Sequence, residues 1–355
     1  MKRLFLILML SALLSMPVYA AEAFDTGEVE AALPESAKGI IGGMDISGLS
    51  VDGILSALGD YFAAHIKSEL RAVLRPVGAT VAAALLCSVG ESVQLKKEID
   101  YVNLAGCLVV AVAAVGDVNS VASMGREAIE EMHEFSKVLL PMLCSVAAAA
   151  GAAGSAAAKY AATALFLDIL ISVARNLLLP LVGAYTAALI ASAATGDGRL
   201  KGAVKLMKWL SKTAMTALVA IFSFYLGLTG LAASGADAAA AKTAKALISS
   251  IVPVVGKMVA GASESLVAGA SLIRNAVGIF GLGAVLAVCA APFLAIGLRY
   301  LLFKAVAAVV QLIAGDRIGS LVEGIGSVYG MVLGLVGTAA VFLFVSILSL
   351  IRTVV

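Results

Sequence analysis

Charged residues are scarce in this chain. Lysine, arginine, aspartate and glutamate make up 14% of it, against about 25% in a typical soluble protein. Hydrophobic residues make up 61%, and three runs, 213–236, 275–298 and 324–351, contain no charged residue. About 20 apolar residues suffice for a helix to cross a bilayer. The scarcity of charge therefore excludes an ordinary soluble protein and predicts a multi-spanning membrane protein.

Residues that commonly perform chemistry are also few. His65 and His133 are the two histidines, and both lie in segments predicted as surface helices, where solvated side chains are the plain interpretation. The four cysteines stand in apolar stretches without metal-ligand spacing, which indicates buried thiols rather than disulfides. No phosphate-binding loop or nucleophile motif occurs, and a net charge of +2 gives no basis for nucleic-acid binding. The sequence predicts a protein that is not an enzyme and uses no cofactor or metal.

The first 20 residues have the pattern of a secretory signal peptide. Lys2 and Arg3 precede an apolar stretch, and Val18-Tyr19-Ala20 resembles a cleavage site. An uncleaved signal anchor is the alternative. Cleavage after Ala20 would place the mature N-terminus outside the cytoplasm.

Composition divides the rest of the chain into four further parts. Residues 21–71 are predicted to be an extracytoplasmic segment that includes an amphipathic helix. Residues 72–136 are predicted to form two short transmembrane spans and an acidic external helix. Residues 137–245 and 246–355 are predicted to form two membrane repeats. The most basic stretch, 199–212, is predicted to face the cytoplasm. The acidic segment 117–137 is predicted to lie on the opposite side of the membrane, and Arg299 and Lys304 on the cytoplasmic side.

The repeat is suggested by prolines at a constant offset. Pro141 and Pro253 are 112 residues apart, as are Pro180 and Pro292. Two repeats that run in the same direction through the membrane are one interpretation, and chance matches in alanine-rich sequence are the other. The predicted fold is an all-α polytopic membrane protein with about six to eight transmembrane helices, including broken or re-entrant helices.

Ionisable residues inside apolar stretches are the candidate functional residues, because charge at membrane depth is costly and usually serves a purpose. Asp168 and Arg175 are two helical turns apart and share a face, so they either line a path or mark an interface. Residues 250–275 are predicted to form a broken or re-entrant helix, with a surface amphipathic helix as the alternative. The candidate conduit or structural residues are Asp168, Arg175, Pro253, Lys257, Glu264, Arg274, Asn275, Pro292, Asp316 and Arg317.

Several segments resemble one protein family. They are Ile251-Val252-Pro253-Val254-Val255-Gly256, Ala270-Ser271-Leu272-Ile273-Arg274-Asn275-Ala276-Val277-Gly278, Cys289-Ala290-Ala291-Pro292, Gly315-Asp316-Arg317-Ile318 and Leu33-Pro34-Glu35. Together with the signal peptide, they are similar to the stage III sporulation protein AE family. The resemblance covers most of the chain and is strongest over 245–355.

The resemblance implies a role in endospore formation. Members of the family are polytopic proteins of the mother-cell membrane around the forespore. They belong to a channel or secretion-like complex, encoded in one operon, with a secretion-type ATPase and ring-forming membrane proteins as partners. The family supplies no catalytic residues to carry over. A permease-like transporter, with a small-solute path between its two repeats, is the alternative function.

Overall fold

The protein is a bundle of long helices. The computed structural model describes residues 31, 33–41, 51–92, 101–149, 153–195, 200–225 and 256–351. Within these residues the elements are helical, in agreement with the predicted all-α class. They are α3 (Glu35–Ile41), α4 (Val51–Ser92), α5 (Tyr101–Ala149), α6 (Ala153–Val173), the π-helical η2 (Ala174–Leu178), α7 (Leu179–Thr195), a helix over 200–225, and α9 (Gly256–Ile351).

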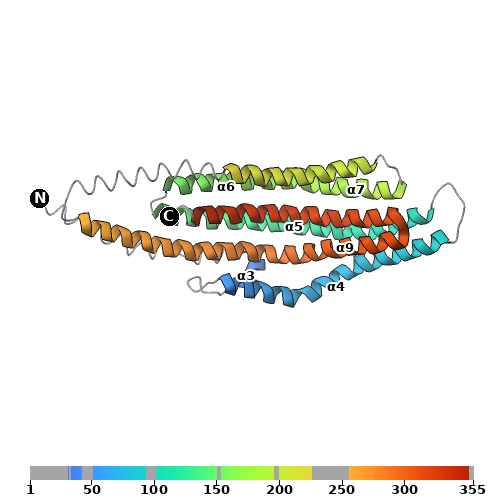
Figure 1. The fold of residues 1–355 in the computed structure, drawn as a ribbon, viewed down its shortest axis with the longest axis horizontal. Coiled ribbons are helices and arrows are strands. Elements are labelled where there is room, and N and C mark those ends of the chain that lie inside the picture. The colour runs from blue at the N-terminus through green and yellow to red at the C-terminus, as the bar shows by residue number, and fades with distance from the viewer. Residues whose placement is uncertain are drawn as a thin grey trace.

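The long helices run alongside one another in an elongated bundle (Figure 1). α5 has 49 residues, which at 1.5 Å per residue makes it about 73 Å long. The hydrocarbon core of a bilayer is about 30 Å thick, or about 40–45 Å with the headgroups. A helix of this length therefore extends well beyond the bilayer if it crosses close to the membrane normal.

Four helices in the described part of the chain are long and apolar enough to cross a membrane: Asp52–Val89, Leu104–Ala148, Gly154–Thr195 and Ile279–Leu350. This number is lower than the predicted six to eight transmembrane helices, because several segments that were predicted separately join into one helix. The acidic segment 117–137 lies inside α5 and is not a separate external helix. No proline interrupts it, and its many glutamates favour helix.

α9 is a hairpin of two helical arms. Its helix is continuous from Gly256 to a kink at Ala314 (φ −117°, ψ 15°) and Gly315 (φ 73°, ψ −176°). A positive φ of this size is open to glycine because it has no Cβ. In Figure 1 the orange first arm and the red second arm meet in this turn.

The position of the kink corrects the prediction of a broken or re-entrant helix over 250–275. Residues 256–275 form an uninterrupted part of the first arm; Pro253 lies outside the described residues. For 256–275 the prediction was wrong because charge at depth does not break backbone hydrogen bonds, and lysine, glutamate and arginine are good helix formers. The described part of α9 is instead interrupted at Ala314 and Gly315.

Two cores follow one another along the bundle. One, which we call the aromatic half, contains Phe135, Phe166, Phe222 and Phe342 among its core residues. The Phe222 and Phe342 rings pack with centroids 4.3 Å apart. The other, the charged half, contains Tyr185, Phe303 and Tyr329, with the last two rings edge to face at 5.1 Å. α5 and both arms of α9 contribute to both halves.

Large apolar side chains also cover much of the outside. Leu86, Val112, Phe224 and Leu312 are each more than two-thirds exposed. Exposed apolar surface on this scale needs lipid or a partner protein to cover it. Together with the four apolar helices, it identifies a membrane protein. The predicted internal repeat stays a prediction.

Candidate functional site

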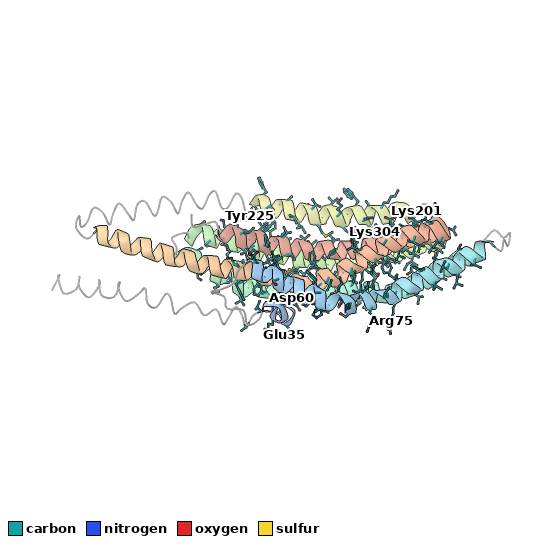
Figure 2. The ribbon with its side chains drawn as sticks, turned by 60° about the horizontal axis from the view of Figure 1, so that its bottom comes forward. Glu35, Asp60, Arg75, Lys201, Tyr225 and Lys304 are labelled. Carbon is teal, nitrogen blue, oxygen red and sulfur yellow. The ribbon has the colours of Figure 1, made fainter. Side chains whose placement is uncertain are left out.

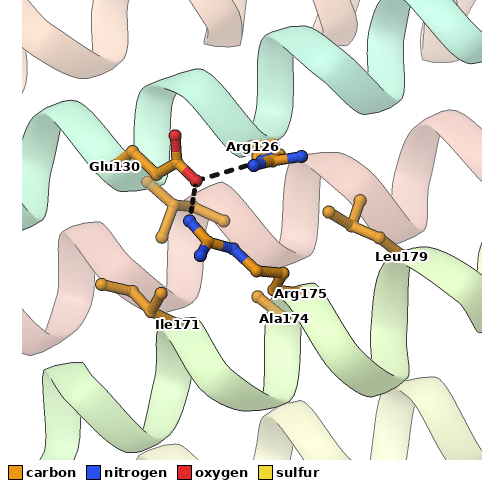
Figure 3. Close-up of a pocket in the computed structure, with 7 residues that line it drawn as sticks. Arg126, Glu130, Ile171, Ala174, Arg175 and Leu179 are labelled. Carbon is orange, nitrogen blue, oxygen red and sulfur yellow. Dashed lines mark hydrogen bonds and ion pairs between the residues drawn. The ribbon is translucent and has the colours of Figure 1, made fainter.

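Arg175 belongs to a charged cluster between η2 and α5 (Figure 3). The Nε of Arg126 donates to Oε1 of Glu130 at 3.0 Å, and Nη2 of Arg175 donates to the same oxygen. Ile171 and Leu179 flank the cluster on the side of α6 and α7. The adjoining cavity has a volume of about 10 Å³, which is the size of a single water site. The cluster therefore joins η2 to α5 and leaves no room for a larger ligand.

Asp168 contacts α5 one turn away from that cluster. Its Oδ1 lies 3.5 Å from Nε2 of His133, whose side chain is 15% exposed. Asp168 and Arg175 thus both contact α5, in keeping with their predicted shared face, but each has its own partner. The interpretation of His133 as a solvated residue was wrong. Among the described residues, its Nδ1 is a buried atom without a hydrogen-bond partner.

Among the described residues, the most buried ionic contact joins residues that the sequence did not single out. The guanidinium of Arg299, 8% exposed, donates from Nε to Oδ1 of Asp117 at 3.1 Å and from Nη1 to Oε2 of Glu69 at 3.3 Å. The hydroxyl of Tyr329 donates to Oδ2 of Asp117 at 2.8 Å. This network, which we call the Arg299 network, joins α4, α5 and both arms of α9.

The network also corrects the predicted topology. Asp117 was expected on one side of the membrane, and Arg299 on the other. Their contact places both at one level of the bundle. The error arose because 117–137 was treated as a compact external helix, whereas in α5 its 21 residues extend about 30 Å along the bundle axis. The cytoplasmic location of 199–212 stays a prediction.

Asp316 and Arg317 lie directly after the kink of α9 and line a larger cavity. This cavity has a volume of about 310 Å³ and lies between α7, the helix over 200–225 and the second arm of α9. We call it the lysine pocket, because Lys201, Lys205 and Lys208 line it from one helix. In Figure 2 Lys201 and Lys304 are near the same end of the bundle, while Tyr225 marks the other end of the 200–225 helix.

The other predicted site residues do not converge on this pocket. Pro292 is buried within the first arm of α9. Lys257, Glu264, Arg274 and Asn275 lie near the beginning of that arm, on its uninterrupted helix. Pro253 is outside the described residues. Their predicted role in a conduit stays a prediction.

Metal and thiol chemistry have no support in the described residues. No group of three or more potential ligands among histidine, cysteine, aspartate and glutamate gathers there. Cys87, Cys107 and Cys289 are buried and Cys144 is half-buried, and none of these four forms a disulfide in the described part of the chain. The predicted thiol state is thus confirmed, except that Cys144 is less buried than expected.

Comparison with known proteins gives one clear result. The sequence model of the stage III sporulation protein AE family matches residues 38–353, which is nearly the whole chain. No curated protein and no solved structure matches the chain.

Proposed function

Because the chain belongs to the stage III sporulation protein AE family, we propose that it is an integral membrane component of the secretion-like channel complex that links mother cell and forespore. Family membership is the observation that carries this proposal. The protein works there by assembly rather than by catalysis. Its location is the mother-cell membrane around the forespore, and its loss prevents endospore development.

The shape of the bundle supports a role in assembly. α5 is about 73 Å long, so a crossing close to the membrane normal leaves about 30 Å of it beyond a bilayer about 40–45 Å thick. The extra length offers surface to partner proteins outside the lipid. The proposed partners are the secretion-type ATPase and the ring-forming membrane proteins of the same operon.

The apolar surface supports the same role. Leu86 and Val112 are 73% and 80% exposed on α4 and α5, and Leu312 is 89% exposed beside the kink of α9. Leu86 and Val112 lie on the parts of α4 and α5 that contribute to the core of the charged half. A surface that combines apolar and charged residues suits contact with both lipid and partner subunits.

Purification from sporulating cells tests the proposal. The tagged full-length protein, extracted in mild detergent, is expected to bring down the ATPase and the ring-forming proteins in fixed ratios. A tagged membrane protein of similar size and unrelated family, expressed in the same cells, is the control. Recovery of the tagged protein without these partners, or equal recovery of them with the control, contradicts the proposal.

A permease-like transporter is the second candidate, and the lysine pocket is the observation that favours it. A cavity of about 310 Å³ with charged and hydroxyl side chains is large enough for a small solute. Liposomes that contain only this protein test the idea through release of trapped labelled phosphate. Release by the protein alone, without co-purification of partners, would replace the first proposal with this one.

A further inference from the structure

The lysine pocket contains more positive than negative charge. Four bases and two acids line it, a net charge of +2. Glu323 is already bound by Lys304, whose Nζ lies 2.9 Å from Oε1. Asp316 is the other acid. The lining residues that carry charge are Lys201, Lys205, Lys208, Arg317, Asp316 and Glu323.

The lysines gather on one face of one helix. Lys201, Lys205 and Lys208 are spaced by four and three residues, which places them on the same side of the 200–225 helix. Like charges at this spacing destabilise a helix. Lys201 and Lys205 have no hydrogen-bond or ion-pair partner in the described part of the chain. An anion bound between the lysines would reduce the repulsion among them.

Lys208 shows the effect of this crowding. Its Nζ donates to Oγ of Ser327 at 3.0 Å. Burial lowers the pKa of Lys208 below its ordinary value, and the positive charge of Lys304 lowers it further, while Glu323 opposes the change. An anion in the pocket would favour the charged form of the lysine.

The rest of the lining suits a phosphate group on an amphiphilic molecule. Ser192, Ser320 and Ser327 bring hydroxyl groups to the cavity, and Leu189 and Val204 give it an apolar wall. The second arm of α9 starts at the pocket, and a helix N-terminus carries partial positive charge that favours anions. The volume of about 310 Å³ accommodates a phosphorylated headgroup.

The adjacent surface points to lipid as the carrier of the phosphate. Trp209 and Leu206 are each 61% exposed next to the lysines. Tryptophan is enriched where a protein meets the membrane–water interface, and basic pockets between helices at that level bind anionic headgroups. We propose that the lysine pocket binds the phosphate group of an anionic lipid headgroup, with Lys201, Lys205 and Lys208 as its main cationic contacts.

The only tryptophan of the chain gives a direct assay. Trp209 follows Lys208 and is the single tryptophan in the sequence, so its fluorescence reports on the pocket. Detergent-solubilised full-length protein is titrated with dihexanoyl phosphatidylglycerol, with the zwitterionic dihexanoyl phosphatidylcholine, and with inorganic phosphate. Phosphatidylglycerol is expected to produce a saturable change in emission at lower concentration than phosphatidylcholine. The same change with inorganic phosphate at comparable concentration would show that a phosphate group is recognised but that its carrier is soluble, which overturns the lipid assignment.

A matched pair of triple variants isolates the pocket from general charge. Lys201→Gln/Lys205→Gln/Lys208→Gln removes three positive charges from the pocket. Lys67→Gln/Arg71→Gln/Arg75→Gln removes three from the exposed face of α4. Since each lysine near an anionic headgroup contributes about 1 kcal/mol, the pocket variant is expected to weaken phosphatidylglycerol binding at least about tenfold, and the α4 variant less than about threefold.

Single substitution keeps the test valid if the triple variant does not fold. Lys205→Gln alone is expected to weaken phosphatidylglycerol binding about fivefold, and circular dichroism checks that its helix content is unchanged. Equal titration of phosphatidylglycerol and phosphatidylcholine, or equal loss in the pocket and α4 variants, overturns the proposal.

Discussion

The aromatic half and the charged half of the bundle hold the same long helices together by different means. In the aromatic half Phe166, Phe222 and Phe342 pack around one another, and the ion pairs of Glu130 lie at the surface. In the charged half an arginine that is 8% exposed joins two acids and three helices. The stability of the aromatic half therefore depends on close apolar packing, and the stability of the charged half depends on a partner for each buried charge.

The reason lies in what each half tolerates. Apolar packing weakens gradually as contacts are lost. A buried ion pair that loses one partner leaves the other charge without compensation. The aromatic half also contains the buried Lys159, whose Nζ donates to the carbonyl oxygen of Ser349 at 2.8 Å. The charged half should therefore be the more sensitive to a single polar substitution.

Removal of Arg299 is expected to have the largest effect. Arg299→Met leaves the largely buried Asp117 and the partly exposed Glu69 without their cation, which lowers the free energy of unfolding by about 3–5 kcal/mol. Thermal unfolding of the purified protein in detergent, followed by circular dichroism, measures the change. Arg299→Lys should recover part of the loss because it restores the charge but not the two-pronged contact. A stability like that of the unchanged protein would mean that the charged half does not depend on its network.

An added methyl group at Gly125 is expected to have an intermediate effect. A Cβ there would lie 2.3 Å from Cγ1 of Val332, so α5 and the second arm of α9 must separate. The overpacking costs about 1–3 kcal/mol, less up to about 1 kcal/mol of improved helix propensity.

The matched control for this substitution is Gly116→Ala in the same helix. No atom lies within 4 Å of a Cβ at Gly116, so the propensity gain acts alone, and unfolding should occur at an equal or higher temperature. The same unfolding assay compares the two variants. If both alanines change stability equally, close approach of α5 and α9 is not what positions the charged half.

The smallest effect is expected at the boundary of the aromatic half. Glu130→Gln removes the acceptor charge shared by Arg126 and Arg175, but the three side chains are 38–52% exposed. Exposed ion pairs contribute about 0–1 kcal/mol, so the unfolding temperature should change little and the change should vanish at high salt. A loss as large as that of Arg299→Met would remove the distinction between the two halves.

The sequence led to part of the candidate site. Asp316 and Arg317 were selected from a short motif that resembles the family, and the structure places both at the lysine pocket. The Arg299 network was missed because its members are 182, 212 and 230 residues apart along the chain. No local pattern marks such contacts, since a single arginine beside an apolar run reads as the end of a span.

Composition and short motifs were enough to predict the membrane class, the helical fold and the family. The ends of the helices and the contacts between charged residues depend on tertiary packing and could not be predicted in this way. The acidic segment continues α5, and the turn of α9 lies at Gly315 rather than near Lys257. Charged residues can continue a helix as readily as they can mark the end of a membrane span. Which of these occurs depends on the packing of the neighbouring helices.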